Sequence, residues 1–463
     1  MIRIDTSINA GDLKHRLDEL WRLAALKVIR LCKNDHPELG TPVFTVDGRY
    51  TSRGWTEWTQ GFVYGGALLV FDATGNEEAL ELGRALTNAR MAPHLTHMGV
   101  HDHGFNNIST YGNLRRLLLE GALPFEKAEL AGYENALRVS GAVQASRWTQ
   151  TSDGGGFVYS FNGPHSLFAD TIRSMRSLAL ADQLGHELRG ENDQRISLLE
   201  RAMDHAVTTA RYTVYYGEGR DHYDVAGRVA HESLFNTNDG AYRAPSTQQG
   251  YSPYTTWTRG LAWVMLGFAE LLEFLAVARS HGIGDESVGD VAGDMMLRAA
   301  QATSDYYLAH TPTDGIPYWD TGAPDLDAIG AYLDLPADPF NPYEPVDSSA
   351  AAIAAQGLLR LGRFLASSGN QDGDRYFRAG LTVLQTLLSE PYLSTDENHD
   401  GILLHTIYHR PNAWDHVADG DSTPHGESAL WGDYHLLEAA LYTQRLFDGG
   451  PYYTFFGPNG EAL

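Results

Sequence analysis

Hydrophobic residues recur at three- and four-residue intervals along most of the chain, the spacing that places them on one face of an α-helix. Leu261, Met265, Phe268 and Leu272 form one such face within residues 258–278. The pattern predicts about a dozen helices. They span residues 13–31, 61–71, 77–91, 108–120, 126–144, 167–184, 196–215, 258–278, 289–308, 348–367, 374–388 and 428–448. Few segments alternate like strands, which disfavours a doubly wound sheet and indicates an all-α fold.

Three longer stretches lack this periodicity and are rich in Gly, Pro, Asp, His and aromatic residues: 216–257, 312–347 and 391–427. Long loops in a compact helical domain usually carry function, so we expect them to line one end of the molecule. No linker or low-complexity run divides the chain, and we expect one domain over residues 1–463. The helices would pair as hairpins in a ring, with the ends of an inner set forming a cleft.

The composition is that of a globular protein, with 43% hydrophobic and 20% charged residues. The formal net charge is −25, from 34 Lys+Arg against 59 Asp+Glu, and it opposes binding to nucleic acid or to an anionic membrane. We therefore expect neither partner. An acidic substrate would need a local cation, and Arg259 is the obvious candidate.

Cys32 is the only cysteine, so the chain can form neither an intrachain disulfide nor a thiolate metal cluster. The first residues, MIRIDTSINAGDLKHRL, lack a basic segment followed by an apolar one, and no uninterrupted apolar run is long enough for a membrane helix. These features predict a cytoplasmic protein.

Residues 231–263 bring together side chains suited to a sugar: His231, Gln249, Arg259 and Trp263. Aromatic faces stack on sugar rings, while imidazole, amide and guanidinium groups bind hydroxyls and carboxylates. The stretch therefore indicates a carbohydrate site. The alternative is that the tryptophans are core residues and the arginine belongs to a helix surface.

Asp102 lies between His101 and His103, directly before a predicted helix. Three interpretations are open. The two histidines could bind a metal, although a third ligand is missing. Asp102 could cap the helix, or it could be a catalytic or substrate-binding carboxylate.

Asp170 is surrounded by apolar residues at helical spacing. Burial of the anion is costly, so we expect a raised pKa and a protonated carboxyl that acts as a general acid; a helix cap is again the alternative. Asp102 and Asp170 would then form a carboxylate pair with separated roles. Trp55 and Trp58 belong to an aromatic cluster that is either core or a platform for the sugar.

Several motifs in order along the chain resemble the unsaturated glucuronyl hydrolases of glycoside hydrolase family 88, which are related to the unsaturated rhamnogalacturonyl hydrolases of family 105. They are WTEWTQGFVYGG from residue 55, HDHGF from 101, ADTIRSM from 169, TQQGYS from 247, TWTRGLAW from 256, VDSSAAAIAAQGLLRLG from 346 and ESALWGDYHLLEAAL from 427. The resemblance implies an (α/α)6 barrel, with Asp170 as general acid and base assisted by Asp102. It places substrate-binding residues at Trp58, His101, His231, Gln249, Arg259 and Trp263.

The enzymes that the chain resembles remove a non-reducing 4,5-unsaturated uronic acid from lyase-generated oligosaccharides by hydration, without a metal or other cofactor. Asp170 would protonate C4 and then draw a proton from the water that attacks C5. Two alternatives remain: a glucuronidase acting on saturated uronides, and a non-catalytic sugar-binding protein. The chain departs from the family at His103, usually apolar, and at Ile172-Arg173-Ser174, which leaves the substrate subclass open.

Overall fold

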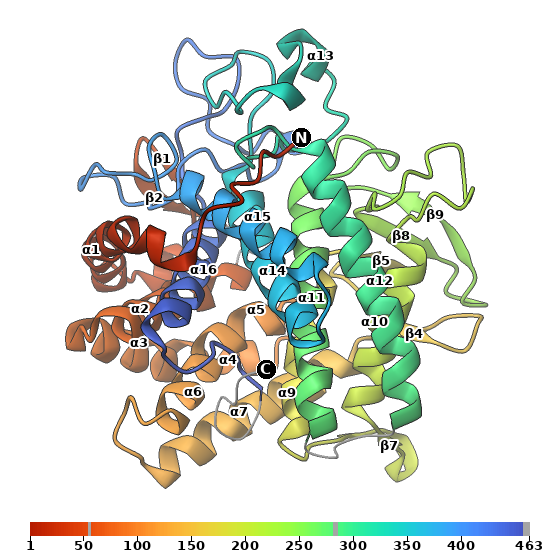
Figure 1. Ribbon diagram of the computed structural model, residues 1–463. Coiled ribbons are helices and arrows are strands. Elements are labelled where there is room, and N and C mark those ends of the chain that lie inside the picture. The colour runs from red at the N-terminus through yellow and green to blue at the C-terminus, as the bar shows by residue number, and fades with distance from the viewer. Residues whose placement is uncertain (54–56, 281–285, 457–463) are drawn as a thin grey trace.

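The computed structural model describes residues 1–53, 57–280 and 286–456, and helices dominate it (Figure 1). The longer helices are α1 Lys14–Lys33, α2 Gln60–Thr74, α3 Glu77–Arg90, α7 Lys127–Ser146, α9 Arg176–Gln183, α10 Leu198–Tyr212, α11 Thr258–Ser280, α12 Glu286–His310, α14 Ser348–Ser367, α15 Asp372–Leu387 and α16 Leu430–Asp448. The shorter ones are α4 Ala92–Leu95, α5 His103–Asn107, α6 Asn113–Leu119, α8 Thr171–Ser174 and α13 Leu326–Ile329. The helices predicted from the sequence are confirmed.

Two predicted helices differ from the structure in detail. Residues 166–168 form strand β5, and the helix that we expected from residue 167 begins only at Thr171. Between α5 and α6 lies η4, the π-helical turn Ile108–Gly112. Periodicity misses both features because neighbouring elements impose them rather than the local sequence.

The strands are short and form small antiparallel sheets at the loops. The pairs are β1 Pro42–Val46 with β2 Arg49–Ser52, β3 Trp148–Gln150 with β4 Gly156–Val158, and β6 Leu188–Arg189 with β7 Arg195–Ile196. The remaining sheet has the order β5 Ser166–Phe168, β8 Glu232–Phe235, β9 Tyr242–Ser246. This sheet holds the segment before Asp170 against the segment that follows His231.

Alternate helical segments build an inner ring. In the described part of the chain α2, α5–η4, α8–α9, α11, α14 and α16 each contact the next, and α16 contacts α2, which closes the ring. Helices α1, α3, α7, α10, α12 and α15 pack around the outside. The arrangement is an (α/α)6 barrel, as expected.

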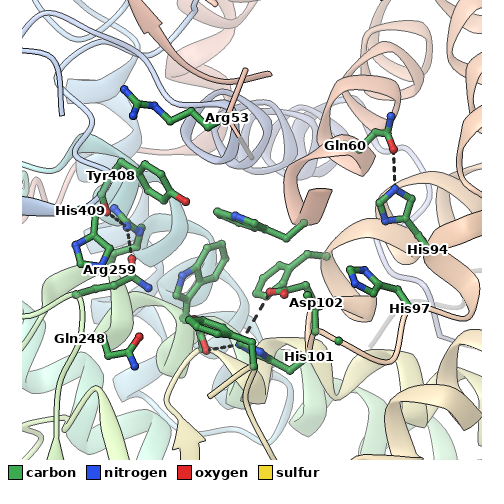
Figure 2. Close-up of a pocket in the computed structure, with 18 of the residues that line it drawn as sticks. Arg53, Gln60, His94, His97, His101, Asp102, Gln248, Arg259, Tyr408 and His409 are labelled. Carbon is green, nitrogen blue, oxygen red and sulfur yellow. Dashed lines mark hydrogen bonds and ion pairs between the residues drawn. The ribbon is translucent and has the colours of Figure 1, made fainter. Parts of the chain in front are cut away.

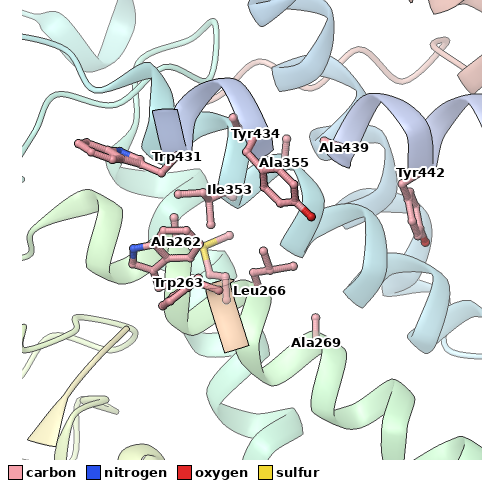
Figure 3. Close-up of a cluster of buried hydrophobic side chains, with 14 of the residues drawn as sticks. Ala262, Trp263, Leu266, Ala269, Ile353, Ala355, Trp431, Tyr434, Ala439 and Tyr442 are labelled. Atoms are coloured by element: carbon pink, nitrogen blue, oxygen red, sulfur yellow. The ribbon is translucent and has the colours of Figure 1, made fainter. Parts of the chain in front are cut away.

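Inner helices have neighbours on every side, so they are apolar around most of their circumference. In α2 the run from Gly61 to Val70 is buried throughout. By length and composition the segment Thr258–Ala278 of α11 could cross a membrane, but 94% of its most apolar window is buried in the molecule, as in the core helix of a globular fold. Figure 3 shows α11, α14 and α16 meeting through Trp263, Ile353 and Trp431.

Buried charges also occupy the interior of the ring. Arg173 in α8 contacts Glu270 of α11, and its Nη2 lies 2.9 Å from Oε2 of Glu438 in α16. Nη1 of Arg360 lies 2.6 Å from Oε2 of Glu273. Each of these buried charges therefore has an opposite partner.

Candidate active site

A cavity of about 1220 Å³ lies where the inner helices begin. Gln60 is the first residue of α2, Asp102 and Asp170 directly precede α5 and α8, and Arg259 is the second residue of α11. All of them line the cavity. The ring thus gathers residues that are far apart in sequence at one end of the barrel.

The structure brings most of the predicted site residues to this cavity. Its lining includes Trp58, His101, Asp102, Asp170, Gln249, Arg259 and Trp263. His231 is not part of the lining and lies behind it. Trp55, also part of the aromatic cluster, lies outside the described residues.

His101 lies within reach of both carboxylates, and Figure 2 shows it beside Asp102. Its Nε2 is 3.2 Å from Oδ1 of Asp170 and 4.0 Å from Oδ1 of Asp102. His101 is 2% exposed and each aspartate 9%, so solvent screens these interactions little. A single imidazole therefore couples both acids.

The coupling sets the protonation of the three groups. Burial alone would raise the pKa of Asp170, but the attraction of His101 and its hydrogen bond hold that pKa below the usual value. Burial raises the pKa of Asp102, with His101 opposing the shift and Asp170 adding to it. Burial would lower the pKa of His101, but the two carboxylates raise it.

The expectation of a raised pKa at Asp170 is therefore wrong for this structure. The apolar neighbours in sequence do not form its immediate surroundings, because His101 reaches it from a distant segment. Asp170 thus faces His101 as a carboxyl with a lowered pKa, and the raised carboxyl pKa belongs to Asp102.

Neither aspartate caps its helix. Asp102 occupies the N-cap position of α5 and Asp170 that of α8, yet neither side chain accepts a capping hydrogen bond. The capping interpretation is wrong for both, and the carboxylates remain available to the cavity.

His103 does not join a metal site with His101. Its Nδ1 lies 3.0 Å from Ser140 Oγ and its Nε2 2.9 Å from the carbonyl oxygen of His97. Both ring nitrogens thus have protein partners on the side away from Asp170. Burial lowers the pKa of His103 to about 4, so it is a neutral structural residue.

A close helix contact sets the spacing of the two acids. A side chain at Gly104 would place its Cβ 2.5 Å from Cα of Ser174. The backbone N–H of Gly104 donates to Ser174 Oγ at 2.7 Å. Gln144 of α7 fixes both sides, donating to the His101 carbonyl at 2.7 Å and accepting from Ser174 Oγ at 3.1 Å.

His231 and Arg259 hold the opposite wall of the cavity in place. His231 Nδ1 accepts the N–H of Gln248 at 2.9 Å, and its ring packs on Phe168 and Trp257 with centroid distances of 4.5 and 4.8 Å. Arg259 Nη2 donates to Oε1 of Gln249 at 3.0 Å. Both residues orient the loop that carries the two glutamines.

Tryptophans provide apolar faces on the cavity. Trp58 stacks on Trp431 with ring centroids 5.2 Å apart and lies edge-on to Phe105. Trp263 is held edge-on by Phe105 and His435, at 4.9 and 4.7 Å. The rings are fixed by other rings, as expected of a stacking surface that keeps its shape.

Sequence reasoning missed part of the wall. Tyr408, His409 and Trp414 line the cavity from the 391–427 loop. Figure 2 shows Tyr408 and His409 on the side opposite Gln60 and His94. His409 is only 8% exposed although it lies in a long loop. The long loop was the available signal, but only the fold shows which of its residues face inward.

Comparison with known proteins identifies the family of the chain. A sequence model of Glycosyl Hydrolase Family 88 matches residues 43–309, more than half of the chain. An unsaturated glucuronyl hydrolase of Bacillus sp. (strain GL1) is 27% identical over 402 residues, 86% of this chain and 89% of that protein. An unsaturated chondroitin disaccharide hydrolase of Streptococcus pyogenes serotype M1 is 25% identical over 444 residues, 93% and 91% of the two chains.

Solved structures agree with the barrel. The crystal structure of the unsaturated glucuronyl hydrolase from Bacillus sp. GL1 superimposes with a TM-score of 0.70 at 22% identity, covering 95% of this chain and all (100%) of that one. An unsaturated glucuronyl hydrolase specific for heparin gives 0.70 at 20% identity, over 94% and 98% of the chains. With the family match over more than half of its length, the chain belongs to glycosyl hydrolase family 88 and is a glycosidase.

Proposed function

We propose that this enzyme removes an unsaturated uronic acid from the non-reducing end of an oligosaccharide by hydrating its C4=C5 bond. The observation that carries the proposal is the pair of buried carboxylates joined by His101 in a tryptophan-walled cavity. The names of the relatives, unsaturated glucuronyl and chondroitin disaccharide hydrolases, support the same substrate class.

The chemistry requires one acid that then becomes a base. Asp170 gives a proton to C4, and positive charge develops at C5 and the ring oxygen. A water molecule attacks C5 while the anionic Asp170 takes one of its protons. The hemiketal at C5 then opens, the glycosidic bond breaks and the aglycone leaves, so one water is consumed.

His101 supplies the proton that Asp170 lacks at rest. Moving one proton along the 3.2 Å contact converts the ion pair into neutral imidazole and protonated Asp170. A bound sugar displaces water from the cavity, and loss of water favours the neutral pair over the ion pair. Substrate binding thus produces the protonated Asp170 that the first step requires.

An anionic substrate needs positive charge close to it, because the chain carries a net charge of −25. The N-terminal end of α11 faces the cavity with its partial positive charge and is one source of local positive charge. The cavity of about 1220 Å³ exceeds the volume of one sugar ring and leaves room for the aglycone.

The proposal is tested with lyase-generated disaccharides, following the ultraviolet absorbance of the conjugated alkene. The enzyme should abolish this absorbance, and Asp170→Asn should slow the reaction by at least about 10²-fold, the usual contribution of a positioned acid/base. Asp204→Asn, on the remote helix α10, is the matched control and should retain full activity.

Two results would overturn the proposal. One is hydrolysis of saturated 4-nitrophenyl glucuronides together with indifference to unsaturated disaccharides, which would indicate a conventional glucuronidase. The other is unchanged sugar binding with no turnover by the wild-type protein, which would indicate a binding protein.

A further inference from the structure

Three metal-binding side chains meet outside the active site, on separate segments of the chain. They are Asp47 in the β1–β2 turn, and His416 and Glu427 in the loop before α16. Their ligand atoms all lie within 4.8 Å of one another, and His416 Nε2 is 3.5 Å from Asp47 Oδ1. None of the three belongs to the lining of the active-site cavity.

We propose that Asp47, His416 and Glu427 bind one divalent transition-metal ion such as Zn²⁺. Ligands about 2.1 Å from an ion at tetrahedral angles are about 3.4 Å apart. The separation of 3.5 Å between His416 and Asp47 fits this value. The ligand atoms all lie within 4.8 Å of one another, and the side chain of Asp47 is 87% exposed, so it can turn towards an ion.

The segment that carries Glu427 is held in place. Glu427 accepts hydrogen bonds from Thr45 Oγ1 and from the backbone N–H of Gly48, and its side chain is only 17% exposed. The neighbouring Ser428 exchanges hydrogen bonds with Thr45 at 2.8 and 2.9 Å. The carboxylate therefore keeps its position before an ion arrives.

A second histidine lies beside the carboxylate. His399 Nε2 is 3.6 Å from Glu427 Oε2. Such a supporting partner behind a ligating group is usual at metal sites. A cavity of about 10 Å³, about the space of one water, adjoins His416 and Glu427.

The chemical types of the three ligands determine which ion the site prefers. One neutral imidazole and two carboxylates carry two negative charges, which a divalent ion neutralises. Imidazole favours Zn²⁺ and its transition-metal neighbours over Ca²⁺ and Mg²⁺, which prefer oxygen alone. Affinity should rise from Mn²⁺ through Co²⁺ towards Zn²⁺.

The ion would tie one wall of the active site to the β1–β2 hairpin. Asp415, next to His416, accepts the backbone N–H groups of Tyr408 and His409. Both of those residues line the cavity. The effect is on the position and stability of that wall, and the chemistry at Asp170 proceeds without the ion.

Calorimetric titration of chelator-treated protein with Zn²⁺, Mn²⁺ and Ca²⁺ tests the site, together with Tm. We expect one Zn²⁺ per chain, a raised Tm, weaker binding of Mn²⁺ and no saturable binding of Ca²⁺. His416→Gln and Glu427→Gln should each weaken Zn²⁺ binding by at least about 10-fold. Co²⁺ should show visible absorption bands that disappear in His416→Gln.

His425→Gln is the matched control, since it removes an imidazole of the same loop that pairs with Asp421 at 3.0 Å. It should leave Zn²⁺ affinity unchanged. The proposal fails if the protein binds no Zn²⁺, if His416→Gln binds as tightly as the wild type, or if the control loses as much affinity. Tighter Ca²⁺ than Zn²⁺ binding would also refute the assignment.

Discussion

Arg259 has a protein acceptor for each of its four terminal N–H groups. Nη1 donates to Asp347 Oδ2 at 2.9 Å and to the Ile407 carbonyl, while Nη2 donates to Gln249 and to the Tyr408 carbonyl at 2.7 Å. The sequence suggested a ligand for the uronate carboxylate. In the structure the guanidinium lines the cavity and also fixes its wall. Because it can only donate, it turns the amide oxygen of Gln249 towards itself and leaves the NH₂ group as a donor.

We expect Arg259→Lys to lower stability as well as activity. An ammonium has three donors and no planar fork, so the buried Asp347 keeps fewer partners, at a cost of about 1–3 kcal/mol. Urea unfolding and kcat/KM measured together check this. Gln249→Ala is the companion variant and should raise KM while leaving Tm unchanged; a lysine variant with wild-type Tm and lost binding would restore Arg259 as a direct ligand.

The proton on His101 depends on Asp170, and Asp170→Asn should lower the pKa of His101. Since the folded pKa of His101 is raised above 6.5, its contribution to the free energy of unfolding is fully present below pH 6.5. That contribution is lost as pH rises through the folded pKa. NMR titration of labelled histidines and unfolding between pH 5 and about 9 measure both effects, which should shrink in the variant; an unshifted titration would separate His101 from Asp170.

Among the elements, the contact between α5 and α8 controls the geometry of the two acids. Gly104→Ala would force the backbone at Ser174 away, because backbone cannot yield as a flexible side chain does. We expect kcat/KM to fall at least about 10-fold, since small displacements of catalytic groups are costly. Gly132→Ala, on an open face of α7, is the control and should leave activity unchanged with equal or higher Tm. Equal activity of both variants would show that the spacing is not critical.

The helices were predictable from the sequence because each inner or outer segment carries its own periodic pattern. The strand at 166–168 was not, because it exists through pairing with residues 232–234. The same limit applies to Asp170: its identity as a site residue was readable from a motif, whereas its protonation depends on His101, which only the fold brings to 3.2 Å. Long-range contacts therefore determine both the strand at 166–168 and the protonation of Asp170.

Across the whole molecule, buried ion pairs hold the inner ring together. Arg173, one of the departures from the family pattern, points to Glu438 and Glu270 and does not line the cavity. His103, the other departure, is also buried outside that lining. The differences that left the substrate subclass open therefore concern the packing of the barrel.

We expect Glu438→Gln to destabilise the fold by about 3–5 kcal/mol, because it removes one of the two carboxylates that neutralise the buried Arg173 and Arg176 and leaves them to share Glu270. Burial would raise the pKa of Glu438, but Arg173 and Arg176 hold it at about 2, so its contribution is present above pH 4.5 and disappears as pH falls towards 2. Urea unfolding at pH 7 and pH 4 checks this. Glu397→Gln breaks an exposed pair with Arg22 and should leave stability unchanged; equal losses would contradict the role of burial.

Closure of the ring between α2 and α16 also has a consequence for the order of events during synthesis. Trp58 stacks on Trp431, and β1 is bridged at Phe44 to Ala429, so one wall of the site joins an early segment to a late one. A ribosome delivers α2 long before α16, and until then the apolar faces of the early helices have no partner. The nascent chain must keep this surface from aggregating for most of its translation, and the enzyme becomes competent only when its last long helix is released.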